Sequence, residues 1–175
     1  MTDPTDVRVV YNRVVGSKRI LSGASLDEHL TGDAERAPHA LHRRLPDYAP
    51  TALVEAPALA EQLGVGTVLL KDESERLGLP AFKILGASWA IYRALEGRLG
   101  RSLEPWQNVA ELARKLEPWQ PMILAAATDG NHGRAVAHMA ALLGFQARIF
   151  VPRGTVAARI TAIASEGAQV EVTQT

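Results

Sequence analysis

The feature that most constrains the fold is a regular alternation of strand-like and helix-like segments in the C-terminal part of the chain. Short apolar, β-branched runs are separated by longer segments whose apolar residues recur at helical spacing; in order, these are 122–127, 132–143, 147–151, 155–165 and 168–172. Strands that alternate with helices in this way form βαβ units, which build a parallel sheet with right-handed crossovers. The sequence therefore predicts an α/β fold in which a parallel sheet carries flanking helices.

The same segments carry more specific predictions. The run 122–127 is continuously apolar, as expected of a buried strand, and Thr155 is placed to cap the helix that follows it. The helix at 132–143 should turn one apolar stripe to the core, made of Ala135, Val136, Met139, Ala140 and Leu143. Because the chain stops directly after the last strand, and parallel strands usually have helices over both faces, the sequence looks truncated there.

Shorter elements are predicted in the middle of the chain. Residues 57–63 begin with proline and end before Gly64, which favours a helix. Residues 67–71 favour a strand. A further helix, 109–116, lies in a polar connection, and two copies of the tetrapeptide EPWQ mark its boundaries.

The helix predicted at 82–95 has two distinct faces. Its large apolar residues form one stripe: Phe82, Leu85, Trp89 and Tyr92. The second stripe consists of small residues after its first member: Lys83, Gly86, Ala87, Ala90 and Ala94. A face of small residues permits close approach of a neighbouring element, so Lys83, at the edge of that face, is expected to be partly buried.

Residues 1–46 are predicted to be an irregular N-terminal segment, and 47–175 to form the folded domain. A strand is considered only at residues 7–11. His29, His39 and His42 lack the spacing that would place them on one face of a regular element, which favours a solvated loop over a metal site.

Charge and composition exclude several classes of function. The chain has 19 Lys and Arg and 19 Asp and Glu, so no net field draws it to nucleic acid or to an anionic membrane. It has no cysteine, which removes disulfides, thiolate nucleophiles and cysteine-ligated zinc. No apolar stretch approaches the roughly 20 residues of a membrane span, and the N-terminus lacks the features of a secretory signal. We therefore expect a soluble, cytoplasmic protein.

The most informative motif is Thr-Asp-Gly-Asn-His-Gly at residues 128–133, between a predicted strand and a predicted helix. Gly130 permits a tight turn with positive φ, and Asn131 is a good N-cap. Unpaired amides and the helix dipole behind Asn131 would make an anion site at the carboxyl end of a parallel strand. A well-capped helix without a ligand explains the motif equally well.

Three side chains are candidates for chemistry. Asp129 borders the predicted anion site and is either an acid/base group or an alternative cap, and His132 is either an acid/base group or an ordinary helix residue. Desolvation beside Phe82 and Ile84 would free the amine of Lys83 as a nucleophile or Schiff-base partner, although most lysines at helix starts are merely solvated. The glycines form neither a dinucleotide fingerprint nor a P-loop.

Taken together, these motifs resemble those of the tryptophan synthase β-like (fold-type II) pyridoxal-phosphate enzymes. Residues 71–74 (KDES) followed by 81–87 (AFKILGA) are similar to the family's cofactor-lysine segment, and 128–133 is similar to its asparagine loop. Aspartate at 129, where dehydratases and racemases commonly have serine, resembles the diaminopropionate ammonia-lyases. The likeness covers 48–172 and implies the N-terminal part of a fold-type II enzyme, with 47–175 as a partial domain.

The resemblance implies a role for each site residue. Lys83 would bind pyridoxal phosphate covalently and then move protons, and Asn131 would hydrogen-bond the phenolic oxygen of this cofactor. Asp129 would be the second acid/base group. Backbone amides of the loop would bind the substrate carboxylate: Gly130, Asn131, His132 and Gly133. The implied reaction is an α,β-elimination that converts 2,3-diaminopropionate to pyruvate and ammonia.

Two other hypotheses stay open. A serine/threonine dehydratase-like enzyme shares the motifs, although Asp129 speaks against it, and a catalytically inactive fragment with only a structural or association role would keep the same residues. Nothing in the sequence matches the family's glycine-rich phosphate loop or its partner for the pyridine nitrogen. For a full-length protein the resemblance implies a homodimer acting on a small amino acid, with no metal, nucleic-acid or membrane partner.

Overall fold

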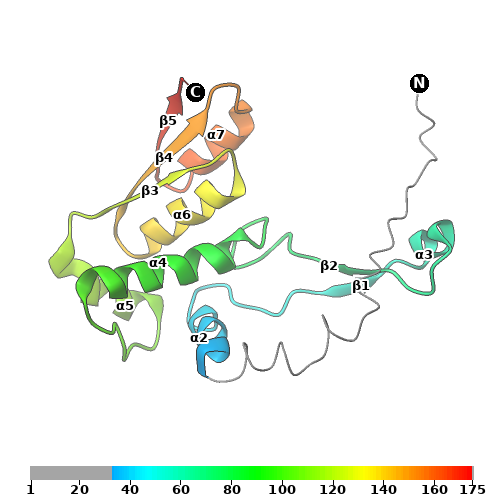
Figure 1. The fold of residues 1–175 in the computed structure, drawn as a ribbon, viewed down its shortest axis with the longest axis horizontal. Helices are drawn as coiled ribbons and strands as arrows, with labels where there is room; N and C mark the ends of the chain where they lie inside the picture. Colours follow the sequence, from blue (N-terminus) through cyan, green and yellow to red (C-terminus); the bar gives the residue numbers. More distant parts are fainter. Residues whose placement is uncertain (1–32, 175) are drawn as a thin grey trace, which may run out of the picture. The chain divides into compact units, whose positions relative to one another are not determined.

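The computed structural model describes residues 33–174 (Figure 1). The chain divides into two compact units, Met1–Ala37 and Pro38–Thr175, and the account below concerns the second. The strand considered at residues 7–11 lies outside the described residues, as does His29.

A three-stranded parallel sheet forms the C-terminal part of this unit. Strands β3 (Ile123–Ala127), β4 (Gln146–Pro152) and β5 (Gln169–Thr173) are hydrogen-bonded in that order. Helix α6 (Asn131–Leu142) joins β3 to β4, and α7 (Ala157–Ala164) joins β4 to β5 (Figure 1). The predicted α/β fold with βαβ units is confirmed.

Both crossover helices lie on the same face of the sheet. The order β3-β4-β5 with right-handed crossovers requires this arrangement. Contacts agree with it, because the position of a Cβ on Gly133 of α6 would lie within 3.5 Å of Ile163 of α7 and within 2.8 Å of Ile149 of β4. The apolar stripe predicted for α6 is confirmed, since each of its residues is buried.

The opposite face of the sheet is uncovered within residues 33–174, which shows that the prediction of a buried strand at 122–127 is wrong. Side chains of β3 alternate between half-buried and exposed, and Ile123 is 53% exposed. A short apolar run fits a strand covered on one face as well as a strand covered on both. The pattern therefore identified the strand but not its surroundings.

Helix α7 begins without the predicted cap. Thr155 donates its hydroxyl to the carbonyl of Pro152, at 2.8 Å, and so closes the turn that leaves β4. Val156 takes the N-cap position and offers no side-chain acceptor. The cap was assigned two residues from the first helical residue, Ala157, where the hydroxyl serves the turn instead.

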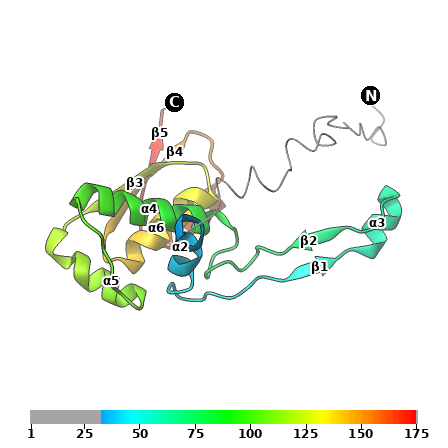
Figure 2. The ribbon, with the colours of Figure 1, turned by 60° about the horizontal axis from the view of Figure 1, so that its bottom comes forward.

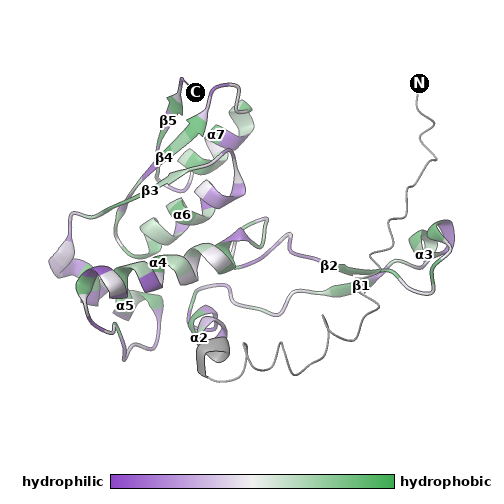
Figure 3. Ribbon diagram, viewed as in Figure 1, coloured by the Kyte–Doolittle hydropathy of each residue, from purple (hydrophilic) through white to green (hydrophobic). Residues whose placement is uncertain are grey.

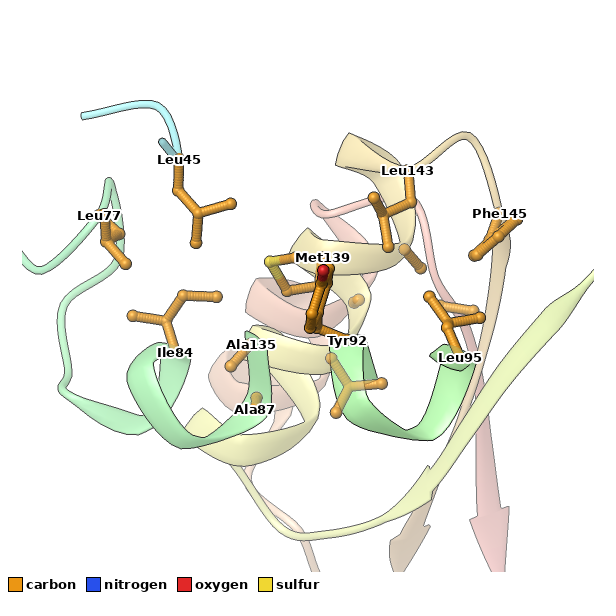
Figure 4. Close-up of a cluster of buried hydrophobic side chains, with 14 of the residues drawn as sticks. Leu45, Leu77, Ile84, Ala87, Tyr92, Leu95, Ala135, Met139, Leu143 and Phe145 are labelled. Atoms are coloured by element: carbon orange, nitrogen blue, oxygen red, sulfur yellow. The ribbon is translucent and has the colours of Figure 1, made fainter. Parts of the chain in front are cut away.

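The long helix α4 (Lys83–Leu99) packs against α6 and lies at the centre of the core. Figure 4 shows Ile84 and Ala87 of α4 beside Ala135 of α6, with Leu45 near them. Small side chains on both helices allow their backbones to come close together. The two helices therefore form one packed pair.

The predicted stripe of large residues on α4 is only partly right. Tyr92 is buried as expected, but Phe82 precedes the helix and is 54% exposed. The helix turns the face of Ile84 and Ala87 to α6, which directs Phe82 away from the core. The orientation of α4 is therefore set by its close packing against the small residues of α6, and not by burial of its largest side chains.

The predicted helix in the connection is confirmed as α5 (Val109–Leu116), capped by Asn108, whose side chain accepts from the amide of Glu111 at 3.1 Å. The two EPWQ copies flank it as expected but differ in structure. The first places Trp106 in the core, whereas the second forms the short 3-10 helix η1 (Glu117–Trp119).

Strands β1 (Leu53–Glu55) and β2 (Leu69–Lys71) form an antiparallel pair with helix α3 (Pro57–Leu63) between them (Figure 2). Helix α3 is confirmed, with Gly64 in the left-handed region at φ 63°. The predicted strand 67–71 is shorter in the structure, and β1 was not predicted. Green segments in Figure 3 mark β1, β2 and α3 as partly hydrophobic. Several of their large hydrophobic residues and of those next to them are exposed: Leu53, Val54, Leu59, Leu63, Val65, Leu69 and Leu70.

Helix α2 (Asp33–His42) occupies a stretch that was predicted to be irregular. Its polar composition and an internal proline, Pro38, hide a helix whose last two residues, Leu41 and His42, are buried. His39 and His42 are three residues apart on this helix, so the prediction that no regular element relates them is wrong.

Candidate active site

The loop between β3 and α6 contains the predicted anion site and is organised by Thr128. The amide of Thr128 donates to the carbonyl of Phe150 on the neighbouring strand, at 2.9 Å. Its hydroxyl oxygen accepts from the amides of Gly130 and Gly133, each at 3.3 Å. This role was not predicted, although a threonine followed by Asp129 and Gly130 at the end of a strand is typical of a turn.

Helix α6 begins at Asn131, so the predicted N-cap is one residue off. Gly130 is the N-cap residue, with an extended φ of 177°, and the predicted positive φ is not observed. The side chain of Asn131 is exposed and makes no hydrogen bond to the described residues. Its amide group is therefore free to bind a ligand.

Two amides at the start of α6 are open. Those of Gly130 and Gly133 are used by Thr128, whereas those of Asn131 and His132 have no acceptor among residues 33–174. Free amides at a helix N-terminus attract anions, and the helix dipole adds to that attraction. The geometry is thus compatible with the predicted carboxylate site.

Gly133 is required by close packing rather than by its backbone angles. A Cβ there would lie 2.3 Å from Cγ2 of Thr128 and 2.8 Å from Cγ2 of Ile149. Distances of this size are shorter than any relaxed carbon contact. The glycine lets α6 start directly against the sheet.

Asp129 lies at the exposed side of this loop. Its side chain is 73% exposed, and Arg159 of α7 donates to its backbone carbonyl at 3.3 Å and to its Oδ2 at 3.5 Å. The carboxylate is thus accessible to a ligand and lies beside a cation. Arg159 was not singled out from the sequence.

A half-buried ion-pair cluster fixes α6 to the loop before β5. Glu166 accepts from Nε of Arg134 and from Nδ1 of His138, each at 2.8 Å. Burial raises the pKa of Glu166, but the hydrogen bonds from His138 and Arg134 outweigh it and the pKa is lowered. The carboxylate therefore stays ionised and holds the helix in place.

Lys83 is the first residue of α4, and its side chain is exposed. Its Nζ lies 4.7 Å from the ring centroid of Phe82 and makes no hydrogen bond or ion pair within the described part of the chain. The predicted partial burial is therefore wrong for residues 33–174. The amine is accessible instead.

Lys83 and Asn131 begin the two helices that pack together, α4 and α6. In Figures 1 and 2 both helices start at the same end of their packed pair, and Figure 4 shows residues near these starts in contact. The structure thus brings the elements of these site residues together.

A cleft of about 600 Å³ lies between α4, η1, β3 and α6. The predicted small-residue face of α4 lines it with Ala87, Ala90 and Ala94, and His132 contributes from the start of α6. Within the described residues the small face therefore borders a cleft as well as α6. His132 is exposed at its edge.

Two kinds of feature are absent from residues 33–174. No helix there is long and apolar enough to cross a membrane. No three His, Asp or Glu side chains there gather closely enough to hold a metal ion.

Comparison with known proteins gives a consistent result. Residues 45–175 match the family described as pyridoxal-phosphate dependent enzyme. The chain is 36% identical over 157 residues to the diaminopropionate ammonia-lyase of Salmonella typhimurium, which covers 89% of this chain but 39% of that protein. It thus spans about two fifths of this relative's length.

Solved structures agree with the sequence comparison. The diaminopropionate ammonia-lyase of Escherichia coli in its apo form matches with a TM-score of 0.71 and 37% identity, over 79% of this chain and 37% of that one. The same enzyme in complex with D-serine matches with a TM-score of 0.72 and 37% identity, over 79% of this chain and 35% of that one.

Proposed function

Because this chain belongs to the family of pyridoxal-phosphate dependent enzymes, we propose that it is part of an ammonia-lyase that converts 2,3-diaminopropionate to pyruvate and ammonia. One observation carries the proposal. An accessible carboxylate, Asp129, precedes the open amides of α6, and the accessible amine of Lys83 begins the helix packed against α6. The similarity to diaminopropionate ammonia-lyases supports the choice of substrate.

The available groups fit part of the cofactor. Pyridoxal phosphate needs an amine for its aldehyde, a partner for its ring oxygen and several donors for its phosphate. Lys83 and Asn131 supply free groups for the first two needs. The open amides of α6 are assigned to the substrate carboxylate, so donors for the phosphate are expected from the portion of the relatives that this chain does not span.

When bound, the cofactor would supply an electron sink for the negative charge left on the substrate's α-carbon. The amides of Asn131 and His132 would hold the substrate carboxylate and so orient the α-hydrogen. Lys83 would take that proton, and Asp129 would give a proton to the departing β-amine. Arg159 would keep the Asp129 loop in place during this transfer.

The role of Lys83 is tested in the complete protein by borohydride reduction after addition of pyridoxal phosphate, followed by peptide mapping. The label should be on Lys83, because its amine is accessible and makes no hydrogen bond to residues 33–174, whereas the amine of Lys71 donates to the carbonyl of Thr51. Lys71→Arg is the matched control and should leave the label unchanged. A label on Lys71, or none on Lys83, would contradict the assignment.

The role of Asp129 is tested by Asp129→Asn in the same protein. The visible absorbance of the bound cofactor should persist, while turnover falls by about 10²–10⁴-fold, as is typical when a general acid/base group is lost. Glu61→Gln, an exposed acid on α3, is the control and should not change turnover. If Asp129→Asn turns over both diaminopropionate stereoisomers at the wild-type rate, Asp129 has only a structural role in the loop.

A serine/threonine dehydratase-like activity is the second candidate. It is favoured by the D-serine complex of the E. coli relative. Comparing rates separates the two, since turnover of serine or threonine above that of diaminopropionate would select the dehydratase. Absence of turnover with all three, in a protein that holds the cofactor, would favour an inactive fragment.

Cytoplasmic location and a homodimer complete the proposal for the complete protein. The homodimer rests on the sequence resemblance, and the cytoplasmic location is the expectation from the composition and patterning of the sequence. Cell fractionation and light scattering of the purified complete protein test them.

A further inference from the structure

The loop that leads from β2 into Lys83 has a buried turn in its middle, at residues 76–79, although most of its other residues are exposed. Loops commonly lie at the surface with exposed side chains. Here Arg76, Leu77 and Leu79 are 8%, 3% and 4% exposed. Figure 4 shows Leu77 beside Ile84, in the first turn of α4. The loop is therefore packed against the start of the helix that carries Lys83.

Arg76 is the centre of a closed hydrogen-bond network. Its guanidinium pairs with both carboxylate oxygens of Glu73, at 2.6 and 2.5 Å. It also donates to Oγ1 of Thr51 at 2.6 Å and to the carbonyl of Ala49 at 3.2 Å. The hydroxyl of Thr51 donates in turn to Glu73 at 2.7 Å, which closes the ring.

The electrostatics of the pair agree with this geometry. The hydrogen bonds from Arg76, more than those from Thr51, lower the pKa of Glu73 to about 2 against the opposing effect of burial. Both partners are thus charged at neutral pH. Two-point pairing between a guanidinium and a carboxylate fixes orientation as well as distance.

The backbone of Arg76 closes the turn that the side chain anchors. Its amide donates to the carbonyl of Leu79 at 2.8 Å, and the amide of Leu79 donates back at 3.1 Å. Between them Leu77, at φ 52°, and Gly78, at φ 75°, are both left-handed. A left-handed leucine is rare and persists only where its surroundings hold it.

We propose that Arg76 is a positioning residue for Lys83, a role that rests on the proposed function of Lys83. The Arg76–Glu73–Thr51 network fixes the turn at 76–79, and Leu77 transmits that position to the first turn of α4. Within residues 33–174 the amine of Lys83 makes no hydrogen bond or ion pair and lies over the ring of the adjacent Phe82, so its location follows from the backbone of this segment. The network therefore sets where the amine meets the cofactor's aldehyde.

The choice of charged residues supports a geometric role. A buried ion pair is often no more stabilising than apolar residues of the same volume, but it imposes a specific orientation. Glu73, in the KDES run at 71–74 that resembles the family's cofactor-lysine segment, gains a specific structural role in this way. Asp72 adds an acceptor for the amide of Ser74 at 3.0 Å, which shapes the same loop.

The experiment compares Arg76→Lys with Arg93→Lys in the complete protein. Arg93 and Glu96 are also a pair three residues apart, at 2.6 Å, but Arg93 is exposed on α4. The measurement is the rate at which added pyridoxal phosphate becomes borohydride-trappable on Lys83, together with the melting temperature. Arg76→Lys keeps the charge but loses the two-point geometry, and it should slow trapping by roughly tenfold to a hundredfold. Arg93→Lys should trap at the wild-type rate.

Thr51→Val provides a second variant if Arg76→Lys fails to fold, since it removes only one hydroxyl from the network. It should slow trapping severalfold at a temperature where the chain remains folded. A merely structural role would lower the melting temperature and leave the trapping rate of the folded protein unchanged.

The outcomes separate this inference from the proposed function. If the wild-type protein is not labelled on Lys83, the assignment of Lys83 fails and the inference with it. If the wild type is labelled and folded Arg76→Lys, or folded Thr51→Val in its place, is labelled at the same rate, the inference alone is overturned.

Discussion

At the first turn of α6, a glycine determines how closely the helix approaches the sheet, because it has no Cβ. Gly133 has Thr128 and Ile149 within distances that no Cβ could occupy without displacing them. The same displacement would move the hydroxyl of Thr128 away from the amides it binds. Packing and anion-site geometry are therefore coupled at one residue.

Gly133→Ala should destabilise the fold by about 1–3 kcal/mol, because the added methyl overpacks a filled space. Urea unfolding measures the change. Gly86→Ala is the control: a Cβ at this helical glycine meets nothing within 4 Å, so alanine should stabilise by up to about 1 kcal/mol. A Gly133→Ala chain as stable as the wild type would show that the neighbours yield freely.

The sequence identified the candidate site only where the signal is local. Gly130 and Asn131 stand between a strand pattern and a helix pattern, so the motif was readable. Arg159 is thirty positions away from Asp129, and only the fold brings them together. The exposure of Lys83 was mispredicted, because helical spacing does not reveal what covers a helix start.

At the scale of elements, a buried histidine links α2 to α4, beside the core residue Leu41. His42 is 9% exposed, and its Nε2 lies 2.9 Å from the carbonyl of Leu85. Burial lowers the pKa of His42, the hydrogen bond to Leu85 opposes this, and His39 and Arg76 lower it further. The neutral ring is therefore the form that fits between the helices.

This lowered pKa predicts a pH dependence of stability. As the pH falls below 6.5, the unfolded chain takes up the proton of His42 first, so the stabilisation present above that pH is progressively lost. Between about pH 7.5 and about pH 5.5 the urea midpoint should fall less in His42→Gln than in the wild type. His39→Gln, at an exposed ring bonded to Tyr48, removes only a smaller cause of the lowered pKa of His42 and should change the pH dependence less than His42→Gln does. Equal slopes in the wild type and His42→Gln would contradict the prediction.

Helices were predicted correctly where a hydrophobic periodicity coincides with residues that mark the two ends of the helix. Helix α3 has a proline at its start and Gly64 at its end, and α5 lies between the two EPWQ copies. Helix α2 and strand β1 were missed because the first is polar with an internal proline and the second is only three residues long. Helix α2 is hydrogen-bonded to α4, and β1 is paired with β2. Both elements therefore depend on contacts with other segments, which a local sequence pattern does not contain.

At the scale of the whole molecule, residues 1–175 alone are predicted not to be a competent lyase. The open amides identified at Asn131 and His132 can serve one anion, and pyridoxal phosphate and the substrate present two. Purified 1–175 protein given pyridoxal phosphate and diaminopropionate should release no pyruvate, whereas the complete protein should. Saturable cofactor binding with steady turnover by residues 1–175 would show that the described groups suffice.

The three tryptophans of the chain occupy different surroundings, and this gives the protein internal optical reporters. Trp106 is buried with the guanidinium of Arg44 3.6 Å from its ring centroid, so its emission should shift to the red only when the core opens. Trp119 borders the cleft between α4 and β3, so its emission should respond to whatever enters that space. Two identical tetrapeptides thus place one fluorophore to report unfolding and another to report occupancy.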